Sequence, residues 1–226
     1  MRVAALYDVH GNLPALEAVL AQLGDEDLVV VGGDVVGGAF PSECVERLRG
    51  LGARALWLRG NAERELVEPA AGPAGPPPEE LERMRSALTR EQVDFLYGLP
   101  PRVELDVDGL GRVLFCHATP WNDLDIVTPL TPDSRLVRIV EGVEADVVVA
   151  GHTHIQDDRL VGGIRWVNAG SVGMPYEEAD GAFWALLGSD VELRGTVYDA
   201  GALGNYEYPR ALRQEAAEYF ESLVGE

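Results

Sequence analysis

The sequence predicts an α/β protein built around a parallel β-sheet, and two features of its N-terminal quarter carry this prediction. Short apolar runs at 3–7, 28–31 and 54–58 have the length and composition of buried parallel strands. Amphipathic segments at 12–23 and 42–51 lie between these runs and have the residue spacing of helices. Strands and helices that alternate in this way form βαβ units, in which the strands pair in parallel.

The first helix is expected to begin at Asn12, whose side chain can accept a hydrogen bond from the backbone of the first turn. Pro14 suits that turn, because the N–H that proline lacks would have no helical partner there. Apolar residues then recur with helical spacing from Leu16 to Leu23, and Gly24 is expected to end the helix.

Residues 64–101 are predicted to form a helical insertion in the alternating pattern. The stretch 68–78 is rich in Pro, Gly and Ala, which is typical of a flexible connection. Residues 79–97 have helical periodicity, which we expect to break near Thr89, where Thr89 and Gln92 can cap a second helix. The sequence leaves open whether this insertion is a lid or the dimer surface of a homo-oligomer.

The rest of the chain is expected to return to strands and to end in a helix. Asp108 and Gly109 have the composition of a tight turn between the first two of these strands. We expect strands at 103–107, 113–116, 147–150, 165–167, 182–187 and 191–198, and a terminal helix at 210–224.

Composition limits the class of protein. At 226 residues, 46% of them hydrophobic, the chain is expected to fold as a single domain, residues 1–226. The net charge of −20 argues against a nucleic-acid-binding surface, because such surfaces need clustered Lys and Arg. No apolar run approaches the ~18 residues that span a membrane, and no signal peptide begins the chain. We therefore expect a cytoplasmic protein without a membrane partner.

All four histidines lie in short motifs made of metal-ligand residue types. His10 belongs to an Asp-x-His motif, His117 directly follows a predicted strand, and His152 and His154 form Gly-His-x-His. Imidazole together with carboxylate or amide oxygen is a ligand set for Zn, Mn, Fe or Ni. Each motif follows a predicted strand, and in α/β sheets ligands bind beyond the carboxyl ends of the strands. The candidate metal ligands are Asp8, His10, Asp34, Asn61, His117, His152 and His154.

The ordered series Asp-x-His, Gly-Asp, Gly-Asn-x-Glu, His and Gly-His-x-His resembles that of the calcineurin-like metallophosphoesterase superfamily. Residues 8–16 and 168–173 are similar to its small bacterial and archaeal phosphodiesterase branch, and the resemblance extends over 1–187. It implies a four-layer α/β/β/α sandwich with a helical insertion. It also implies a small phosphate-ester substrate, whose phosphodiester bond is hydrolysed by a hydroxide that two metal ions activate.

The resemblance further implies two divalent metal ions, drawn from Mn, Fe, Zn, Ni and Co, with Mn favoured. Asp34 would bridge the two ions. One ion would be held by Asp8, His10, Asp34 and His154, and the other by Asp34, Asn61, His117 and His152.

The sequence departs from the family pattern at Ala62, where many members carry the histidine that protonates the leaving group. Loss of a general acid typically costs about 10²–10⁴-fold in rate, so esters with good leaving groups are expected as substrates. Glu63 remains and is expected to be structural or to pair with an Arg. Asn12 and Arg59 are candidate substrate contacts, with helix capping and pairing to a carboxylate as the respective alternatives.

Two other functions fit the same fold. One is a nucleotide pyrophosphohydrolase acting on dinucleoside polyphosphates. The other is a non-catalytic protein-binding scaffold, a role in which one retromer subunit uses this fold. The complete set of expected ligands favours an enzyme over a scaffold, since a scaffold could lose ligands without penalty.

Overall fold

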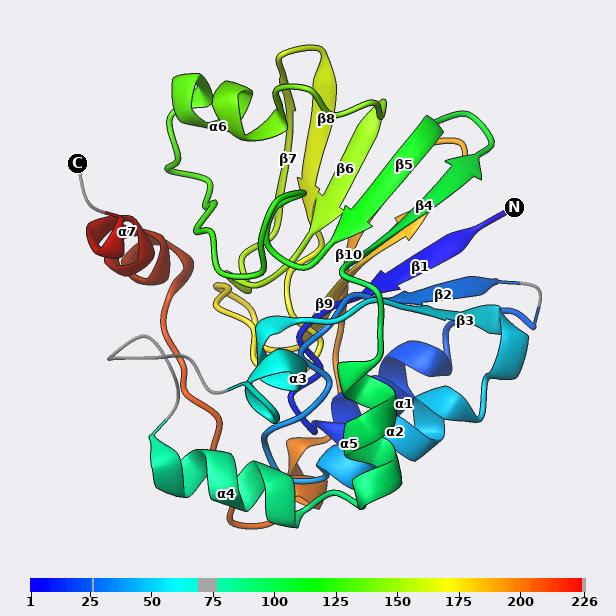
Figure 1. Cartoon of the computed structure of the whole chain (residues 1–226), viewed down its shortest axis with the longest axis vertical. Helices are drawn as coiled ribbons and strands as arrows, with labels where there is room; N and C mark the ends of the chain where they lie inside the picture. Colours follow the sequence, from blue (N-terminus) through cyan, green and yellow to red (C-terminus); the bar gives the residue numbers. More distant parts are fainter. Residues whose placement is uncertain (26, 69–76, 225–226) are drawn as a thin grey trace.

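Two five-stranded β-sheets lie face to face in the computed structural model, which describes residues 1–25, 27–68 and 77–224 (Figure 1). An apolar core formed by residues of both sheets fills the space between them, with Tyr7, Val30, Phe115 and Val149 all fully buried. Helices cover the two outer faces. The molecule is therefore the predicted four-layer α/β/β/α sandwich.

The first sheet has the strand order β10-β9-β1-β2-β3. Its parallel part is the one that the alternating pattern predicts, and β9 and β10 extend it in antiparallel fashion. The strands are β1 (Val3–Leu6), β2 (Leu28–Val31), β3 (Ala55–Trp57), β9 (Ala182–Leu187) and β10 (Val191–Thr196).

The second sheet has the order β4-β5-β6-β8-β7, with three parallel strands in the middle and an antiparallel strand at each edge. The strands are β4 (Arg102–Val107), β5 (Gly111–Cys116), β6 (Val147–Ala150), β7 (Asp157–Val161) and β8 (Ile164–Asn168). The parallel strands of both sheets run toward one central region of the molecule (Figure 1).

Further apolar clusters lie outside the sheets, and the two largest pack helices on the outer faces. The first packs α1 (Leu13–Leu20), α2 (Pro41–Arg49) and α5 (Arg90–Tyr97) on the first sheet. The second packs α6 (Asp133–Val140) on the second sheet, around the fully buried Trp166. The remaining helices are α3 (Asn61–Glu65), α4 (Pro78–Ser86), α7 (Arg213–Leu223) and the 3₁₀ turns Gly52–Arg54 and Ala200–Leu203.

The helical insertion has the predicted break at Thr89. The Thr89 hydroxyl accepts the Gln92 backbone N–H, and the Gln92 side chain accepts the Thr89 N–H, so the capping box is complete. Leu96 of α5 is fully buried in the core of the first sheet, which makes α5 part of the packed body. Most of the predicted connection 68–78 lies outside the described residues.

The structure differs from the prediction mainly in the second half of the chain. Strand β7 was not expected because its exposed sheet-edge position requires few apolar residues. Helix α6, which buries Leu136 and Val140, was also not expected, although it is as long as α1 and α5. Helix α1 ends at Leu20, before Gly24, and α7 begins at Arg213. No helix in the described ranges combines the length and apolar character needed to cross a membrane.

Candidate metal centre

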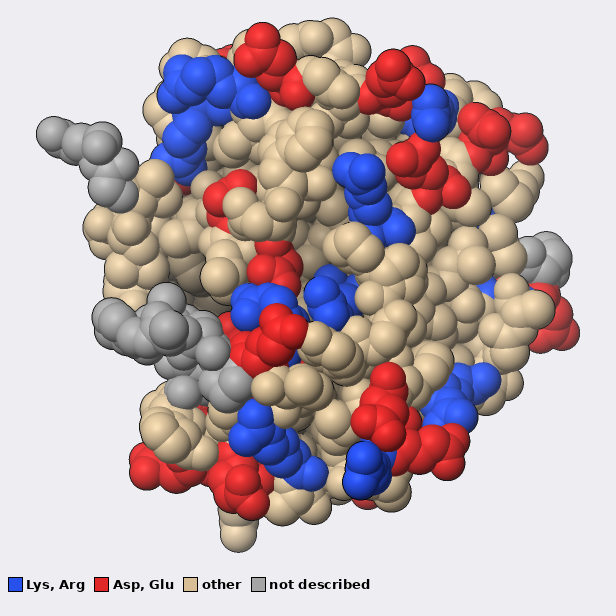
Figure 2. Space-filling view, viewed as in Figure 1, with Lys and Arg blue, Asp and Glu red and all other residues tan. Residues whose placement is uncertain are grey.

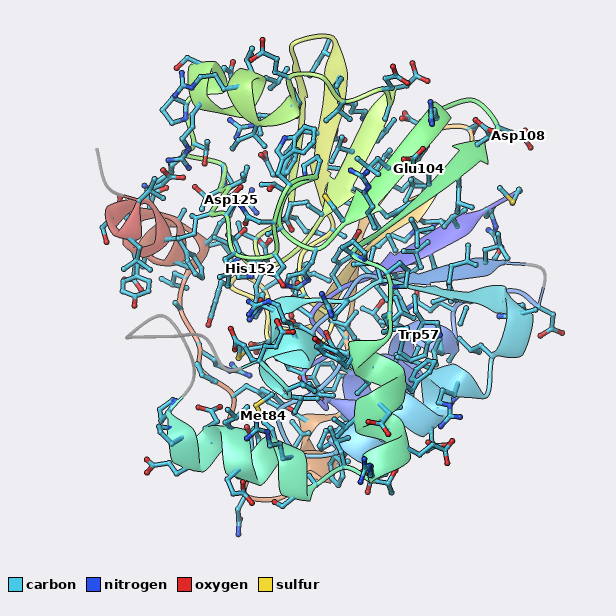
Figure 3. All side chains as sticks on the ribbon, viewed as in Figure 1. Trp57, Met84, Glu104, Asp108, Asp125 and His152 are labelled. Carbon is cyan, nitrogen blue, oxygen red and sulfur yellow. The ribbon has the colours of Figure 1, made fainter. Side chains whose placement is uncertain are left out.

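The predicted ligands come together at the carboxyl ends of the parallel strands. Asp8 and His10 follow β1, Asp34 follows β2, and Asn61 opens α3 just after β3. From the second sheet, His117 directly follows β5, and His152 and His154 follow β6. His152 lies near these strand ends, above α3 (Figure 3). Because both sheets point their strand ends at one region, five separate loops build one cluster.

The backbone is strained at this cluster. Among the described residues, the non-glycine residues with positive φ are all predicted ligands: Asp8 (53°), His10 (43°), Asp34 (52°), His152 (68°) and His154 (59°). The left-handed conformation costs an L-residue roughly 1–2 kcal/mol. Strain of this kind gathers at functional sites, where the surrounding fold holds it in place.

Two glycines leave room for the carboxylates. A Cβ atom on Gly60 would lie 2.2 Å from Asp34 Oδ1, and a Cβ on Gly151 would lie 2.5 Å from Asp8 Oδ2. Both separations are far below van der Waals contact. The glycines that precede Asn61 and His152 in their motifs are therefore required by the approach of another loop.

The potential ligand atoms form two groups that share Asp8, namely Asp8, His10 and His154, and Asp8, Asp34 and His117. Asp8 Oδ1 lies 3.3 Å from His154 Nε2 and 3.9 Å from the Nε2 atoms of His10 and His117. Asp34 presents Oδ1 to His117 Nε2 at 3.5 Å and Oδ2 to His10 Nε2 at 3.9 Å. Each group is the size of a metal coordination sphere, and Asp34 has one oxygen toward each.

The cluster fits divalent cations. Asp8 Oδ1 is buried and has no hydrogen-bond partner in the described structure, which is costly for a carboxylate oxygen. The Nε2 atoms of His10 and His154 face each other at 3.2 Å. The Nδ1 atoms of His117 and His154 donate to the carbonyl oxygens of Gly32 and Met174, at 2.9 and 2.7 Å. These bonds fix the tautomer and turn Nε2 inward, as is common for metal-binding histidines.

Asn61 and His152 complete the cluster. Asn61 Oδ1 lies 3.1 Å from His117 Nε2. The rings of His152 and His117 are 5.2 Å apart between centroids, and the His152 backbone N–H donates to Asp8 Oδ2 at 2.9 Å. All seven predicted ligands are thus neighbours, although their roles in coordination remain a prediction.

Burial and charge set the protonation of the metal-free cluster. Burial lowers the pKa of His117, but the carboxylates of Asp34 and Asp8 outweigh it and raise the pKa to about 9. Burial lowers the pKa of His10 and that of His152 to about 3, so both imidazoles are neutral. Burial raises the pKa of Asp34 to about 7. Without a metal ion, a proton on His117 holds the carboxylates together.

Residues 1–188 match the family model of the calcineurin-like phosphoesterase superfamily domain. The chain belongs to this superfamily. Over 169 residues it is 30% identical to an uncharacterized protein of Methanocaldococcus jannaschii, a match that covers 68% of this chain and 62% of that protein. The matched region therefore spans less than two thirds of this curated relative.

Solved structures share the phosphoesterase fold. A hypothetical protein of Pyrococcus horikoshii OT3 aligns with a TM-score of 0.77 at 23% identity, over 89% of this chain and 90% of that one. A metallophosphoesterase of Sphaerobacter thermophilus aligns with a TM-score of 0.72 at 23% identity, over 99% and 100% of the two chains.

Glu63 is structural in this phosphoesterase domain. It is fully buried, and its carboxylate accepts the backbone N–H groups of Asp34 and Val35 at 2.8 Å and of Gly60 at 2.9 Å. The second expected alternative, pairing with an Arg, does not occur among the described residues. Glu63 therefore ties the loop after β2 to the loop after β3.

The two candidate substrate contacts are both engaged within the protein. Asn12 is fully buried, caps α1, and donates through Nδ2 to the Gly173 carbonyl and the Tyr198 hydroxyl, which leaves no amide atom for a substrate. Arg59 donates to the Tyr97 carbonyl at 3.0 Å and lies over the Tyr97 ring. The carboxylate partner expected for Arg59 is absent from the described residues.

Sequence reasoning missed several residues around the cluster. The Tyr176 ring stacks on His154 at 5.3 Å between centroids, and the Tyr208 hydroxyl donates to the His10 carbonyl at 2.9 Å. Both contacts join segments that are far apart in the chain or separated by a loop. No local pattern signals them.

Proposed function

We propose that this phosphoesterase is a metal-dependent phosphodiesterase that hydrolyses a small phosphodiester. The observation that carries the proposal is the convergence of imidazole nitrogens and carboxylate oxygens around an unpartnered, buried oxygen of Asp8. This arrangement is unfavourable without a cation and suits two ions that share carboxylate ligands.

The donor set accommodates Mn, Fe, Zn, Ni or Co, and Mn²⁺ is the ion that we favour. Two such ions, when bound, lower the pKa of water and neutralise charge on a phosphoryl group. His10, Asp8, Asp34 and His154 would hold one ion. The residues that would hold the other are Asp34, Asn61, His117 and His152.

The residue at position 62 determines how acidic the leaving group of the substrate has to be. Ala62 is buried and offers only a methyl group, while its backbone N–H donates to Asp34 Oδ1 at 2.8 Å. All four histidines belong to the ligand cluster, so no imidazole remains to protonate a leaving oxygen. The substrate should therefore carry a leaving group of low pKa, such as an aryl oxide.

Charge favours a diester over a monoester. The chain carries a net charge of −20, and on the face drawn in Figure 2 the arginines are scattered among acidic side chains without a broad basic surface. A diester has one negative charge near neutral pH and a monoester has close to two. The less charged ester meets the weaker repulsion as it approaches.

A nucleotide pyrophosphohydrolase is the second candidate, and Ala62 favours it too. A nucleoside phosphate is an acidic leaving group and needs no general acid. A panel that contains an aryl diester and a dinucleoside polyphosphate separates the two functions by their relative kcat/KM.

The test is hydrolysis of bis(p-nitrophenyl) phosphate and of p-nitrophenyl phosphate by metal-stripped protein, with and without Mn²⁺. We expect turnover that needs metal, is faster on the diester, and is lost in Asp34→Ala and in His152→Ala. Asp108→Ala, which removes an exposed carboxylate far from the cluster, serves as the control and should keep full activity. Stoichiometric metal binding without turnover of any ester would overturn the proposal.

A further inference from the structure

Glu65 is a buried carboxylate that the proposed reaction does not use. It is the last residue of α3, its side chain is 3% exposed, and its Oε1 atom has no hydrogen-bond partner. Asn61, the first residue of α3, lies four positions earlier, so the two side chains are on the same face of the helix. The carboxylate therefore stands directly behind a predicted metal ligand.

We infer that Glu65 is a positioning residue, which accepts a hydrogen bond from the Asn61 side-chain amide and so turns the Asn61 oxygen toward the metal centre. The inference rests on the proposed metal centre and concerns the orientation of one ligand. It assigns Glu65 no contact with the substrate.

The polarity of the contacts supports this orientation. An Asn amide has nearly the same shape either way round, so only its hydrogen-bond partners decide which end faces where. On one side, Asn61 Oδ1 lies 3.1 Å from His117 Nε2, whose ring is fixed by its Nδ1 bond to the Gly32 carbonyl. On the other side, the Glu65 carboxylate, which can only accept, follows Asn61 by one helical turn on the same face of α3. A flipped amide would set oxygen against oxygen at Glu65.

Two ion pairs that share Arg64 connect Glu65 to a second loop that carries a predicted ligand. Arg64 Nη2 lies 3.6 Å from Glu65 Oε1. The same guanidinium donates two hydrogen bonds to Asp123, from Nε at 2.7 Å and from Nη2 at 3.2 Å. Asp123 lies in the loop that begins with His117, so these ion pairs connect α3 to the loop after β5.

Stability alone does not account for Glu65. The Glu65 side chain is 3% exposed and its Oε1 atom has no hydrogen-bond partner, so the carboxylate is poorly solvated. Buried ion pairs often contribute little net stability, because the loss of hydration offsets the attraction between the charges. Removing Glu65 should therefore affect the metal centre more than the fold.

The test is a double-mutant cycle read by metal binding. Wild type, Glu65→Ala, Glu65→Gln, Asn61→Asp and the double variant Asn61→Asp/Glu65→Gln are stripped of metal and titrated with Mn²⁺ by calorimetry. Urea unfolding of the metal-free variants is measured in parallel. Ala and Gln remove the same charge, so a difference between them reports the loss of the acceptor and of side-chain volume, and the urea data show how much the lost volume affects stability.

We expect Glu65→Ala to weaken the binding of one of two Mn²⁺ ions by about 10–100-fold, the usual effect of losing an outer-shell partner. Glu65→Gln should stay within a few-fold of wild type, because its amide oxygen still accepts. Asn61→Asp should weaken binding, since two carboxylates then face each other. The double variant should restore it, because donor and acceptor have exchanged places.

Asp27→Ala is the matched control. Asp27 is also a buried carboxylate held by an arginine, Arg2, but it precedes β2 and so lies at the end of the sheet away from the cluster. It should unfold at lower urea with Mn²⁺ affinity unchanged. Additive effects in the cycle, or equal losses in Glu65→Ala and Glu65→Gln, would overturn the inference. A wild-type chain that binds no Mn²⁺ would instead overturn the proposed function.

Discussion

His117 holds the proton that a metal ion has to displace. Its pKa is raised to about 9, since the carboxylates of Asp34 and Asp8 outweigh the effect of burial. Below that pH the metal-free imidazolium competes with the cation for Nε2, and above it the competition ends. We predict that Mn²⁺ affinity rises about tenfold per pH unit from pH 7 to 8 and levels off near 9.

Calorimetry in two buffers of different ionisation enthalpy measures the effect, because it reports the protons released on binding. About one proton per chain should be released at pH 7.5. A pH-independent affinity with no proton release would contradict the assignment of His117 as a ligand.

Glu63 links two ligand loops at the scale of one side chain. Its replacement by Ala would leave the backbone N–H groups of Asp34, Val35 and Gly60 without their acceptor in a buried site. Each such loss costs about 1–3 kcal/mol. We predict a fall in unfolding free energy of at least about 3 kcal/mol for Glu63→Ala in urea. The exposed Glu104→Ala should change it by less than about 1 kcal/mol, and equal effects of the two would refute this role.

Ala62 is the residue that shapes substrate choice. We predict that Ala62→His raises kcat/KM for alkyl esters by about tenfold or more, since an imidazole there could protonate a poor leaving group. For aryl esters, whose leaving groups need no proton, kcat/KM should change little. The measurement is a series of phenyl and alkyl esters of graded leaving-group pKa, and an unchanged slope in the variant would count against this account of position 62.

At the scale of elements, α5 belongs to the packed core. Leu96 is fully buried against the first sheet, and the Gln92 amide contacts Ser42 and Glu46 of α2. We predict that Leu96→Ala lowers the unfolding free energy by about 2–5 kcal/mol, as expected for a core leucine. Leu160→Ala, at a leucine that is 73% exposed, is the matched control. A small effect at Leu96 would show that α5 is loosely attached.

The elements that sequence reasoning found are those with strong local signals. The run 28–31 coincides with β2, and Thr89 marks the start of α5, because apolar spacing and capping residues act over a few positions. Strand β7 opens with three consecutive charged residues at 157–159, and this composition resembles that of a loop. It pairs with β8 in a hairpin across Gly162 and Gly163, a local signal that reasoning from apolar runs alone missed.

The candidate site was predictable for the same reason, and only in part. Strand ends followed by Asp, Asn and His could be placed at one rim without coordinates. Three features could not be predicted, because each depends on how two loops meet. They are the position of Asp8 between both ligand groups, the hydrogen bond from His154 to the Met174 carbonyl, and the ion pair of Glu65.

At the scale of the whole molecule, the two sheets act as one frame. Each contributes ligands from the carboxyl ends of its parallel strands, and the cluster exists only where these ends converge (Figure 1). Residues strained into positive φ are confined, among the described non-glycine residues, to that meeting point. The fold therefore stores its backbone strain where the proposed chemistry takes place.

The most direct test of this account is a titration of metal-stripped protein with Mn²⁺, followed by bound metal and by hydrolysis of bis(p-nitrophenyl) phosphate in the same samples. We predict that turnover is absent without metal and rises to a plateau as the second ion per chain is bound. Full activity in the stripped protein, or two bound ions without diester hydrolysis, would contradict the claim that this cluster is a dinuclear phosphodiesterase centre.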